Sequence, residues 1–218
     1  MDDFEKIYLS WRPGQGKRRH IVGVLEHHHD DKFTFDYDKK GIEEAIKEGF
    51  SPYTEFADTQ KTYNGNVLDV FAQRLMKPER SDVQTFYNFW EIEPQFINDK
   101  FYLLGHTQGL LPTDNFEFLA EYKPVTGLHF LTDLARVAER ELISNSVMQG
   151  DKLRYRLDKN NQYYSYAVKV YKGDIELGFI KKIHSKIFYE VGEKKLNLTV
   201  KAIDQNGIIK RIFVKVSV

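Results

Sequence analysis

The stretch GDKLRYRLDKNNQYYSYAVKVYKGDIELGFIKK, residues 150–182, decides the fold of the C-terminal half. Apolar and polar side chains alternate within three short segments, and polar, turn-forming residues separate these segments. Alternation of this kind predicts three antiparallel strands, over residues 150–157, 165–171 and 175–182. Four apolar side chains are expected to face a core: Val168, Val170, Leu177 and Ile180. The other face is then basic and aromatic, which suits a negatively charged polymer with stackable bases.

The chain beyond this stretch ends in a second β pattern. Apolar residues alternate over residues 196–202 and again over 212–218, and Asn206-Gly207 lies between the two segments. Asn-Gly favours the tight turn of a two-residue hairpin, so we expect a β-hairpin here. Upstream, the apolar residues of the segment 132–142 are spaced as on one side of a helix, and we expect a helix there. An all-β barrel with one added helix follows for the second half.

The first half predicts a small sheet with helices on it. Strands are expected over residues 7–11, 21–25 and 32–37. Helices are expected over residues 41–48, over 67–75 with Asn66 as the N-cap, and after Ser81 or Asp82. The predicted fold class is therefore α+β: a small N-terminal sheet with helices, followed by a mostly β barrel.

The charge balance changes sign near residue 124, where the predicted α+β half gives way to the predicted β half. The formal net charge is zero, but residues 1–124 hold 15 Lys and Arg against 22 Asp and Glu, a balance of −7. Residues 125–218 hold 17 against 10, a balance of +7. Because Pro124 and Gly127 punctuate the chain here, we expect two domains, residues 1–122 and 125–218. The basic half could meet phosphates, or the two halves could simply attract each other.

Three sequence features of the C-terminal half resemble the HIRAN domain, a small β-barrel module found beside DNA-remodelling helicases and alone in bacterial proteins. They are Gly150-Asp151, then Asn161-Gln162-Tyr163 with Ala167-Val168, then Gly178-Phe179-Ile180-Lys181-Lys182. The resemblance covers roughly residues 125–218. It implies an OB-like barrel that binds single-stranded DNA. Where the family has Asp and Asn, this chain has Tyr164 and Tyr166, a departure that favours generic strand binding over reading of a 3′ end.

A looser resemblance links residues 1–122 to the N-terminal subdomain of HipA-type toxin kinases. The matching places are Val22-Gly23-Val24-Leu25, residues 33–37, residues 67–75 and residues 107–118. The kinase core itself has no counterpart here, since the chain lacks a Gly-rich nucleotide loop and a catalytic Asp segment. The resemblance therefore implies an interaction or regulatory module, with a possible protein partner.

Nine residues are candidates for contact with nucleic acid. We expect Tyr163, Tyr164 and Phe179 to offer ring faces to bases, with Tyr164 and Tyr166 alternatively in the core. The candidates for phosphate contact are Arg154, Arg156, Lys169, Lys181, Lys182 and His184. If the strand is regular from residue 163, Tyr163 and Lys169 share the ligand-facing side. For Lys181 and Lys182 the alternative is an ordinary solvated turn.

Other functions find little support in the sequence. The chain has no cysteine, no GxSxG and no SxxK motif, so we expect no enzyme activity and no cofactor. His27-His28-His29-Asp30-Asp31 reads as a polar turn rather than a metal site, because neighbouring strand residues point to opposite faces. Gly16-Lys17 lacks the rest of a phosphate-binding loop, and the surrounding segment 12–20 is expected to be a solvated basic loop.

The N-terminus does not resemble a secretory signal, and no apolar run is long enough for a membrane span; a cytoplasmic protein without membrane contact is expected. Two functions remain open. The first is a non-enzymatic module that binds single-stranded DNA or RNA. The alternative is a protein-interaction or antitoxin-like adaptor whose N-terminal half binds a partner.

Overall fold

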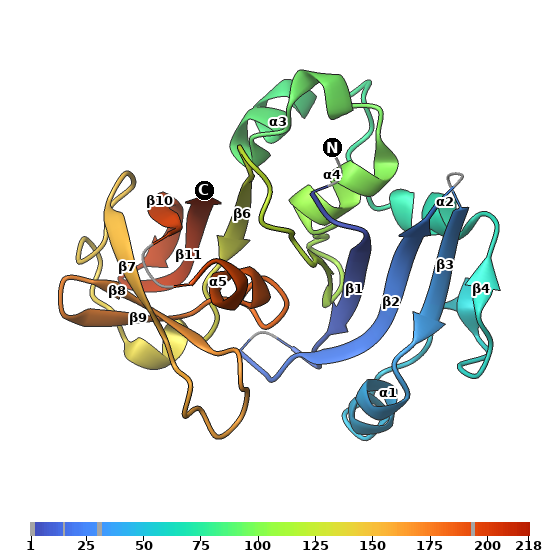
Figure 1. The fold of residues 1–218 in the computed structure, drawn as a ribbon, viewed down its shortest axis with the longest axis horizontal. Coiled ribbons are helices and arrows are strands. Elements are labelled where there is room, and N and C mark those ends of the chain that lie inside the picture. Colours follow the sequence, from blue (N-terminus) through green and yellow to red (C-terminus); the bar gives the residue numbers. More distant parts are fainter. Residues whose placement is uncertain (1–2, 15, 30–31, 193–194) are drawn as a thin grey trace. The chain divides into compact units, whose positions relative to one another are not determined.

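The computed structural model describes residues 3–14, 16–29, 32–192 and 195–218. Two compact units make up the chain, and their boundary falls between Glu121 and Tyr122. Helices account for 21% and strands for 33% of the structure, and each unit is built on one antiparallel sheet (Figure 1). The predicted α+β class, with β structure dominant, is confirmed at this level.

The N-terminal unit has a five-stranded sheet in the order β4-β3-β2-β1-β5. Its strands are β1 (Lys6–Trp11), β2 (His20–His28), β3 (Lys32–Tyr37), β4 (Tyr63–Asn64) and β5 (Phe116–Ala120). Its helices are α1 (Lys39–Ile46), η1 (Thr54–Phe56), α2 (Val67–Ala72), α3 (Val83–Trp90), η2 (Pro94–Phe96) and α4 (Lys100–Thr107). The three predicted strands and the three predicted helices all form. Helix α1 lies so close to β2 that a Cβ on Gly41 would stand 1.6 Å from the carbonyl oxygen of Ile21.

Asn66 and Asp82 occupy the predicted N-cap positions of α2 and α3, but neither side chain forms the capping hydrogen bond. The Asp82 carboxylate instead accepts two hydrogen bonds of 2.8 Å from Arg80. A competing side-chain donor thus removes the carboxylate from the helix end. The side chains that do cap helices are Asp38 on α1 and Asp99 on α4.

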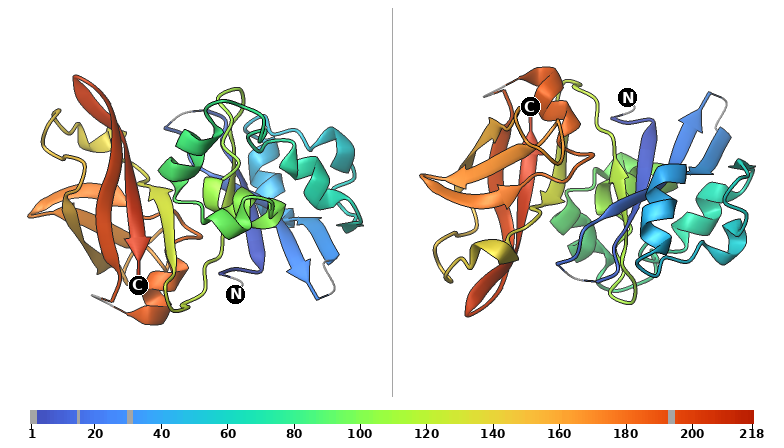
Figure 2. Two further views of the ribbon diagram at one scale, coloured as in Figure 1. Left: turned by 90° about the horizontal axis from the view of Figure 1, so that it is seen from above. Right: turned by 90° about the horizontal axis from the view of Figure 1, so that it is seen from below.

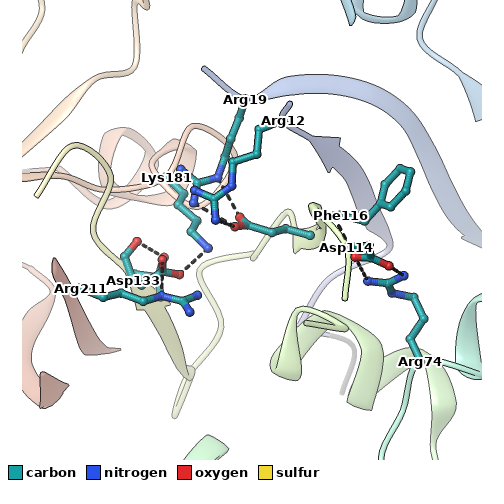
Figure 3. Close-up of polar contacts among 10 residues, drawn as sticks. Arg12, Arg19, Arg74, Asp114, Phe116, Asp133, Lys181 and Arg211 are labelled. Carbon is teal, nitrogen blue, oxygen red and sulfur yellow. Dashed lines mark hydrogen bonds and ion pairs between the residues drawn. The ribbon is translucent and has the colours of Figure 1, made fainter. Parts of the chain in front are cut away.

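Aromatic side chains fill the core of the N-terminal unit. The ring of Phe71 lies 5.0 Å from that of Phe35 and 5.1 Å from that of Phe118, and all three are fully buried. Beside them, Arg74 donates to both carboxylate oxygens of Asp114, at 2.6 and 2.8 Å (Figure 3). Arg74 also donates to the carbonyl of Gly109 at 2.9 Å, so one guanidinium fixes the segment that leads into β5.

The C-terminal unit has a six-stranded sheet, β6-β11-β10-β7-β8-β9, that curls into a half-barrel (Figure 2). Its strands are β6 (His129–Asp133), β7 (Lys152–Leu157), β8 (Val168–Lys172), β9 (Ile175–Phe179), β10 (Asn197–Asn206) and β11 (Ile208–Ser217). One α-helix, α5 (Lys186–Val191), precedes β10. The predicted hairpin forms, with Gly207 at φ 74° between β10 and β11. The four predicted core side chains of residues 168–180 are all buried.

A backbone contact joins the two ends of this sheet. Ala135, two residues beyond edge strand β6, donates to Phe179 of edge strand β9 at 2.7 Å and accepts from it at 3.0 Å. Gly178 makes the approach possible: its φ is 147°, and a Cβ there would stand 2.5 Å from the carbonyl oxygen of Ala135. The sheet therefore curls far enough for the segment just beyond β6 to pair with edge strand β9.

The predicted helix over residues 132–142 is wrong. Strand β6 continues to Asp133, and the segment after it holds only the short 3-10 helix η3 (Ala138–Arg140). Positive φ values at Arg136 (63°) and Glu141 (49°) interrupt any regular helix. Three of the four apolar residues at helical spacing are nevertheless buried, namely Leu134, Val137 and Leu142, whereas Ala138 is exposed. Their spacing therefore reflects a loop that places a side chain in the core every few residues.

Candidate nucleic-acid interface

One row of predicted site residues crosses the strands β7, β8 and β9. Arg156 is the register partner of Lys169, and Lys169 is the register partner of Phe179. Directly opposed residues in antiparallel strands project from the same face of the sheet. Val168 and Val170 flank Lys169 and are fully buried, so this row lies on the opposite, outer face. We define the outer face as five residues: Arg154, Arg156, Lys169, Tyr171 and Phe179.

The two arginines of β7 are exposed. The side chain of Arg154 is 70% exposed and donates to the carbonyl of Gly173 in the β8–β9 turn. The guanidinium of Arg156 lies 5.7 Å from the centre of the Tyr171 ring. Within the described ranges of the chain, Arg156 has no carboxylate partner. Its charge is therefore available to a ligand at the cost of one cation–π contact.

Lys169 and Phe179 lie together at the centre of the outer face. The Lys169 ammonium is 3.4 Å from Asp158 and 5.9 Å from the centre of the Phe179 ring. A hydrogen bond from Asn161 and then the Lys169 charge hold the pKa of the Asp158 carboxyl below its usual value. Phe179 is half-buried, so part of its ring can meet a ligand.

Residues 158–167 form a loop rather than the start of a strand. The side-chain oxygen of Asn161 accepts hydrogen bonds from the backbone N–H groups of Tyr163 (3.0 Å) and Tyr164 (3.1 Å), and this turn delays β8 until Val168. Because residue 163 is outside a strand, the condition of a regular strand fails, and alternation does not place Tyr163 on the side of Lys169. Tyr163 is instead a loop side chain that is 80% exposed.

Two tyrosines of this loop form a cluster with Tyr189 on α5, a residue that was not among the predicted site residues. The ring of Tyr166 lies 5.7 Å from that of Tyr164 and 5.2 Å from that of Tyr189 on α5. The Lys182 ammonium lies 4.9 Å from the centre of the Tyr164 ring. Tyr166 is 44% exposed and Tyr164 is half-buried, so the alternative that these two tyrosines belong to the core is wrong. We call Tyr164, Tyr166 and Tyr189 the tyrosine cluster.

The structure corrects two of the nine assignments, Lys181 and His184. Lys181 is 1% exposed and forms an ion pair with Asp133, which also accepts a 2.9 Å hydrogen bond from Arg211 (Figure 3). His184 is fully buried, and its Nδ1 lies 2.8 Å from the hydroxyl of Thr132. The reason is that β9 ends at Phe179, after which the chain turns inward toward α5 and no longer alternates.

Two arginines near Phe179 were missed by sequence reasoning. The guanidinium groups of Arg136 and Arg140 lie 5.8 and 5.9 Å from the centre of its ring. Both residues fall in the stretch predicted as a helix, and in a helix the 3.6-residue repeat would have determined where their side chains point. No local signal in the sequence announces that the loop after β6 pairs with β9.

The three arginines of the basic loop in the N-terminal unit are paired with carboxylates of that unit. Arg19 donates to both oxygens of the buried Glu117 carboxylate at 2.9 Å, and Arg12 lies 3.5 Å from the same carboxylate (Figure 3). Arg18 lies 3.3 Å from Glu44. Three of its cations are thus already engaged, which corrects the expectation of a purely solvated loop.

The histidine-rich segment contributes two residues to strand packing. His27 stacks on Phe33, with ring centres 4.6 Å apart, while Nε2 of His28 lies 2.8 Å from the hydroxyl of Thr34. Asp30 and Asp31 lie outside the described residues. Among the described residues, no group of three or more His, Cys, Asp and Glu side chains is arranged to hold a metal ion.

No protein-family model, curated protein or solved structure matches the chain. No helix among the described residues is both long enough and apolar enough to span a membrane. The site therefore has to be interpreted from its own residues: exposed cations in a row, ring faces beside them, and a curled sheet beneath.

Proposed function

We propose that the C-terminal unit is a non-enzymatic module that binds single-stranded nucleic acid, DNA in the first instance, on its outer face. The observation that carries the proposal is the row Arg156–Lys169–Phe179, which combines two cations and an aromatic ring on adjacent strands. Phosphates of a strand would meet the cations while a base stacks on the ring. A base–aromatic contact of this kind is worth about 1–3 kcal/mol.

The tyrosine cluster supports a binding path longer than one nucleotide. Tyr163 and Tyr166 expose ring faces on the loop before β8, and Lys182 lies beside Tyr164. A single strand offers unpaired bases to such rings, whereas a duplex keeps its bases stacked in its interior. We therefore expect preference for single strands. The sheet is curled, and the segment just beyond β6 pairs with β9 at Ala135 and Phe179; this supports an OB-like barrel of the HIRAN type, and we include that assignment in the proposal.

Fluorescence anisotropy with labelled oligonucleotides tests the proposal. We expect single strands to bind more tightly than a duplex of the same sequence, with affinity that falls steeply between about 50 and 200 mM salt. The Arg156→Ala/Lys169→Ala variant should bind at least about tenfold more weakly. The matched control Lys195→Ala/Lys210→Ala removes two exposed lysines of the same unit that do not belong to the outer face as defined above. Equal affinities of the two double variants would refute the proposed site.

The competing proposal is a protein-interaction adaptor that acts through residues 1–122. It is favoured, for that unit, by the internal pairing of its basic loop, which leaves fewer cations for nucleic acid. A stoichiometric protein partner that is retained from nuclease-treated lysate by residues 1–122, together with no oligonucleotide binding by the full chain, would replace the first proposal with this one.

A further inference from the structure

The loop after β6 is fixed beside the outer face by its backbone. The two hydrogen bonds between Ala135 and Phe179, of 2.7 and 3.0 Å, place Arg136 immediately next to the end of β9. The close approach depends on Gly178, as described above. Arg136 and Arg140 thus stand at the outer face through β-type pairing rather than through a flexible tether.

Both arginines face the ring that we expect to stack a base. Their guanidinium groups lie 5.8 and 5.9 Å from the centre of the Phe179 ring, and the Lys169 ammonium lies 5.9 Å from the same centre. Three cations around one ring are more than cation–π packing needs, since a single cation already gains what the ring face offers. In such a cluster the ring can stack on a base while the cations contact the phosphates on either side of that base.

Each arginine is held by one carboxylate of the same unit. Arg136 donates through Nε at 2.7 Å to Glu139, three residues away, and both side chains are about half exposed. Arg140 donates through Nη2 to Glu176 of β9, and these two side chains are 27% and 29% exposed. The carboxylates therefore occupy guanidinium positions that a phosphate oxygen would use.

We propose that Arg136 and Arg140 are further phosphate contacts of the outer face, and that Glu139 and Glu176 act as internal competitors that a bound strand displaces. This inference rests on the proposed function. The exposed Arg136–Glu139 pair contributes little to stability, and the Arg140–Glu176 pair is only partly buried, so phosphates can replace these carboxylates at modest cost. Arginine suits the exchange, because its planar fork donates hydrogen bonds to carboxylate and phosphate oxygens with the same geometry.

A competing role and a structural role of Glu139 and Glu176 predict opposite changes in affinity when the two carboxylates are removed. If Glu139 and Glu176 only held the arginines in place, their removal would weaken binding. If they compete with phosphate, Glu139→Gln/Glu176→Gln should bind a labelled oligo-dT about tenfold more tightly than the unmodified chain. Asp158 is left unchanged in this test, because it also accepts a hydrogen bond from Asn161 and helps to hold the loop.

A matched control separates competition at the site from a change in net charge. Glu190→Gln/Asp204→Asn removes the same two negative charges at exposed positions of α5 and β10. We expect this control to change affinity less than about threefold, because neither carboxylate pairs with Arg136, Arg140 or an outer-face cation among the described residues, and exposed charges are screened at 0.15 M salt. A second variant, Arg136→Ala/Arg140→Ala, should lose at least about tenfold in affinity.

The outcomes separate the inference from the proposed function. Unchanged or weaker binding by Glu139→Gln/Glu176→Gln, or an equal gain in the control, overturns the inference; with Arg156→Ala/Lys169→Ala still defective, the proposed function stands. Binding that appears only in the Gln variant supports the inference strongly. Absence of oligo-dT binding in every variant overturns both.

Discussion

Two basic regions of the C-terminal unit use their charges in opposite ways. Lys181 and Arg211 are ion-paired with the buried Asp133, and Lys181 is 1% exposed. Arg154 and Arg156 stand exposed on the outer face of the sheet. A buried ion pair has lost its water and can only be broken at high cost, whereas an exposed cation can exchange partners. Net charge alone therefore does not identify a binding surface; the pairing of each cation does.

The buried region should dominate stability. Asp133→Ala removes the buried ion pair between Asp133 and Lys181 and should lower the free energy of unfolding of the C-terminal unit by about 3 kcal/mol. Arg156→Ala on the outer face should change it by no more than about 0.5 kcal/mol. Both tryptophans, Trp11 and Trp90, lie in the N-terminal unit. Urea unfolding followed by circular dichroism and by tryptophan fluorescence should therefore assign the loss to the C-terminal unit. If Asp133→Ala lowered the free energy of unfolding by less than about 1 kcal/mol, the buried ion pair would not differ from the exposed cations in its effect on stability.

The backbone contact between Ala135, just beyond β6, and Phe179 on β9 lies between the two regions, and Gly178→Ala should break it. The new methyl group would stand 2.5 Å from the carbonyl oxygen of Ala135, a backbone atom that cannot rotate away. We expect a loss of about 2–3 kcal/mol in the free energy of unfolding. Gly173→Ala is the matched control, because its φ is also positive (56°) but nothing lies within 4 Å. It should cost only about 1 kcal/mol. Equal costs would mean that the closing contact contributes no stability.

Adjacent lysines sharpen the comparison further. Lys182→Ala should weaken binding of single-stranded DNA about threefold and leave unfolding unchanged, because the residue is exposed beside Tyr164. Lys181→Ala should lower stability and leave the affinity of the folded protein unchanged. Anisotropy titrations and urea unfolding on both variants check this crossover. If Lys181→Ala weakened binding in a fully folded protein, the buried role of Lys181 would be contradicted.

The sequence predicted strands and core well because their signals are local. Val168, Val170 and Leu177 alternate within single strands, and Asn206-Gly207 defines its hairpin by turn geometry alone. It failed where a distant residue decides the conformation. The loop after β6 carries apolar residues at helical spacing, yet its pairing with Phe179, more than forty positions along the chain, keeps it extended at Ala135.

The candidate site was predicted in part for the same reason. Arg154, Arg156, Lys169 and Phe179 lie on regular strands, so their side followed from alternation. Lys181 and His184 lie beyond the end of β9, where alternation no longer holds. Only the tertiary structure shows that Asp133 pairs with Lys181, because the local sequence pattern around Lys181 cannot reveal a buried carboxylate on another strand.

The smallest expected effect tests the loop that carries Tyr163. Hydrogen bonding from Asn161, and then Lys169, lowers the pKa of Asp158 in the folded protein. A lowered pKa stabilises the fold above the unfolded value, about pH 4, and this contribution is lost as the pH falls through the lower folded pKa. Asp158→Asn should therefore be less stable than the unmodified chain at pH 5, and the difference should shrink toward pH 2.5. Urea unfolding at both pH values measures it. A difference that is the same at pH 5 and pH 2.5 would show that the Asp158 charge does not hold the loop, and that Asn161 alone orders the tyrosines beside the outer face.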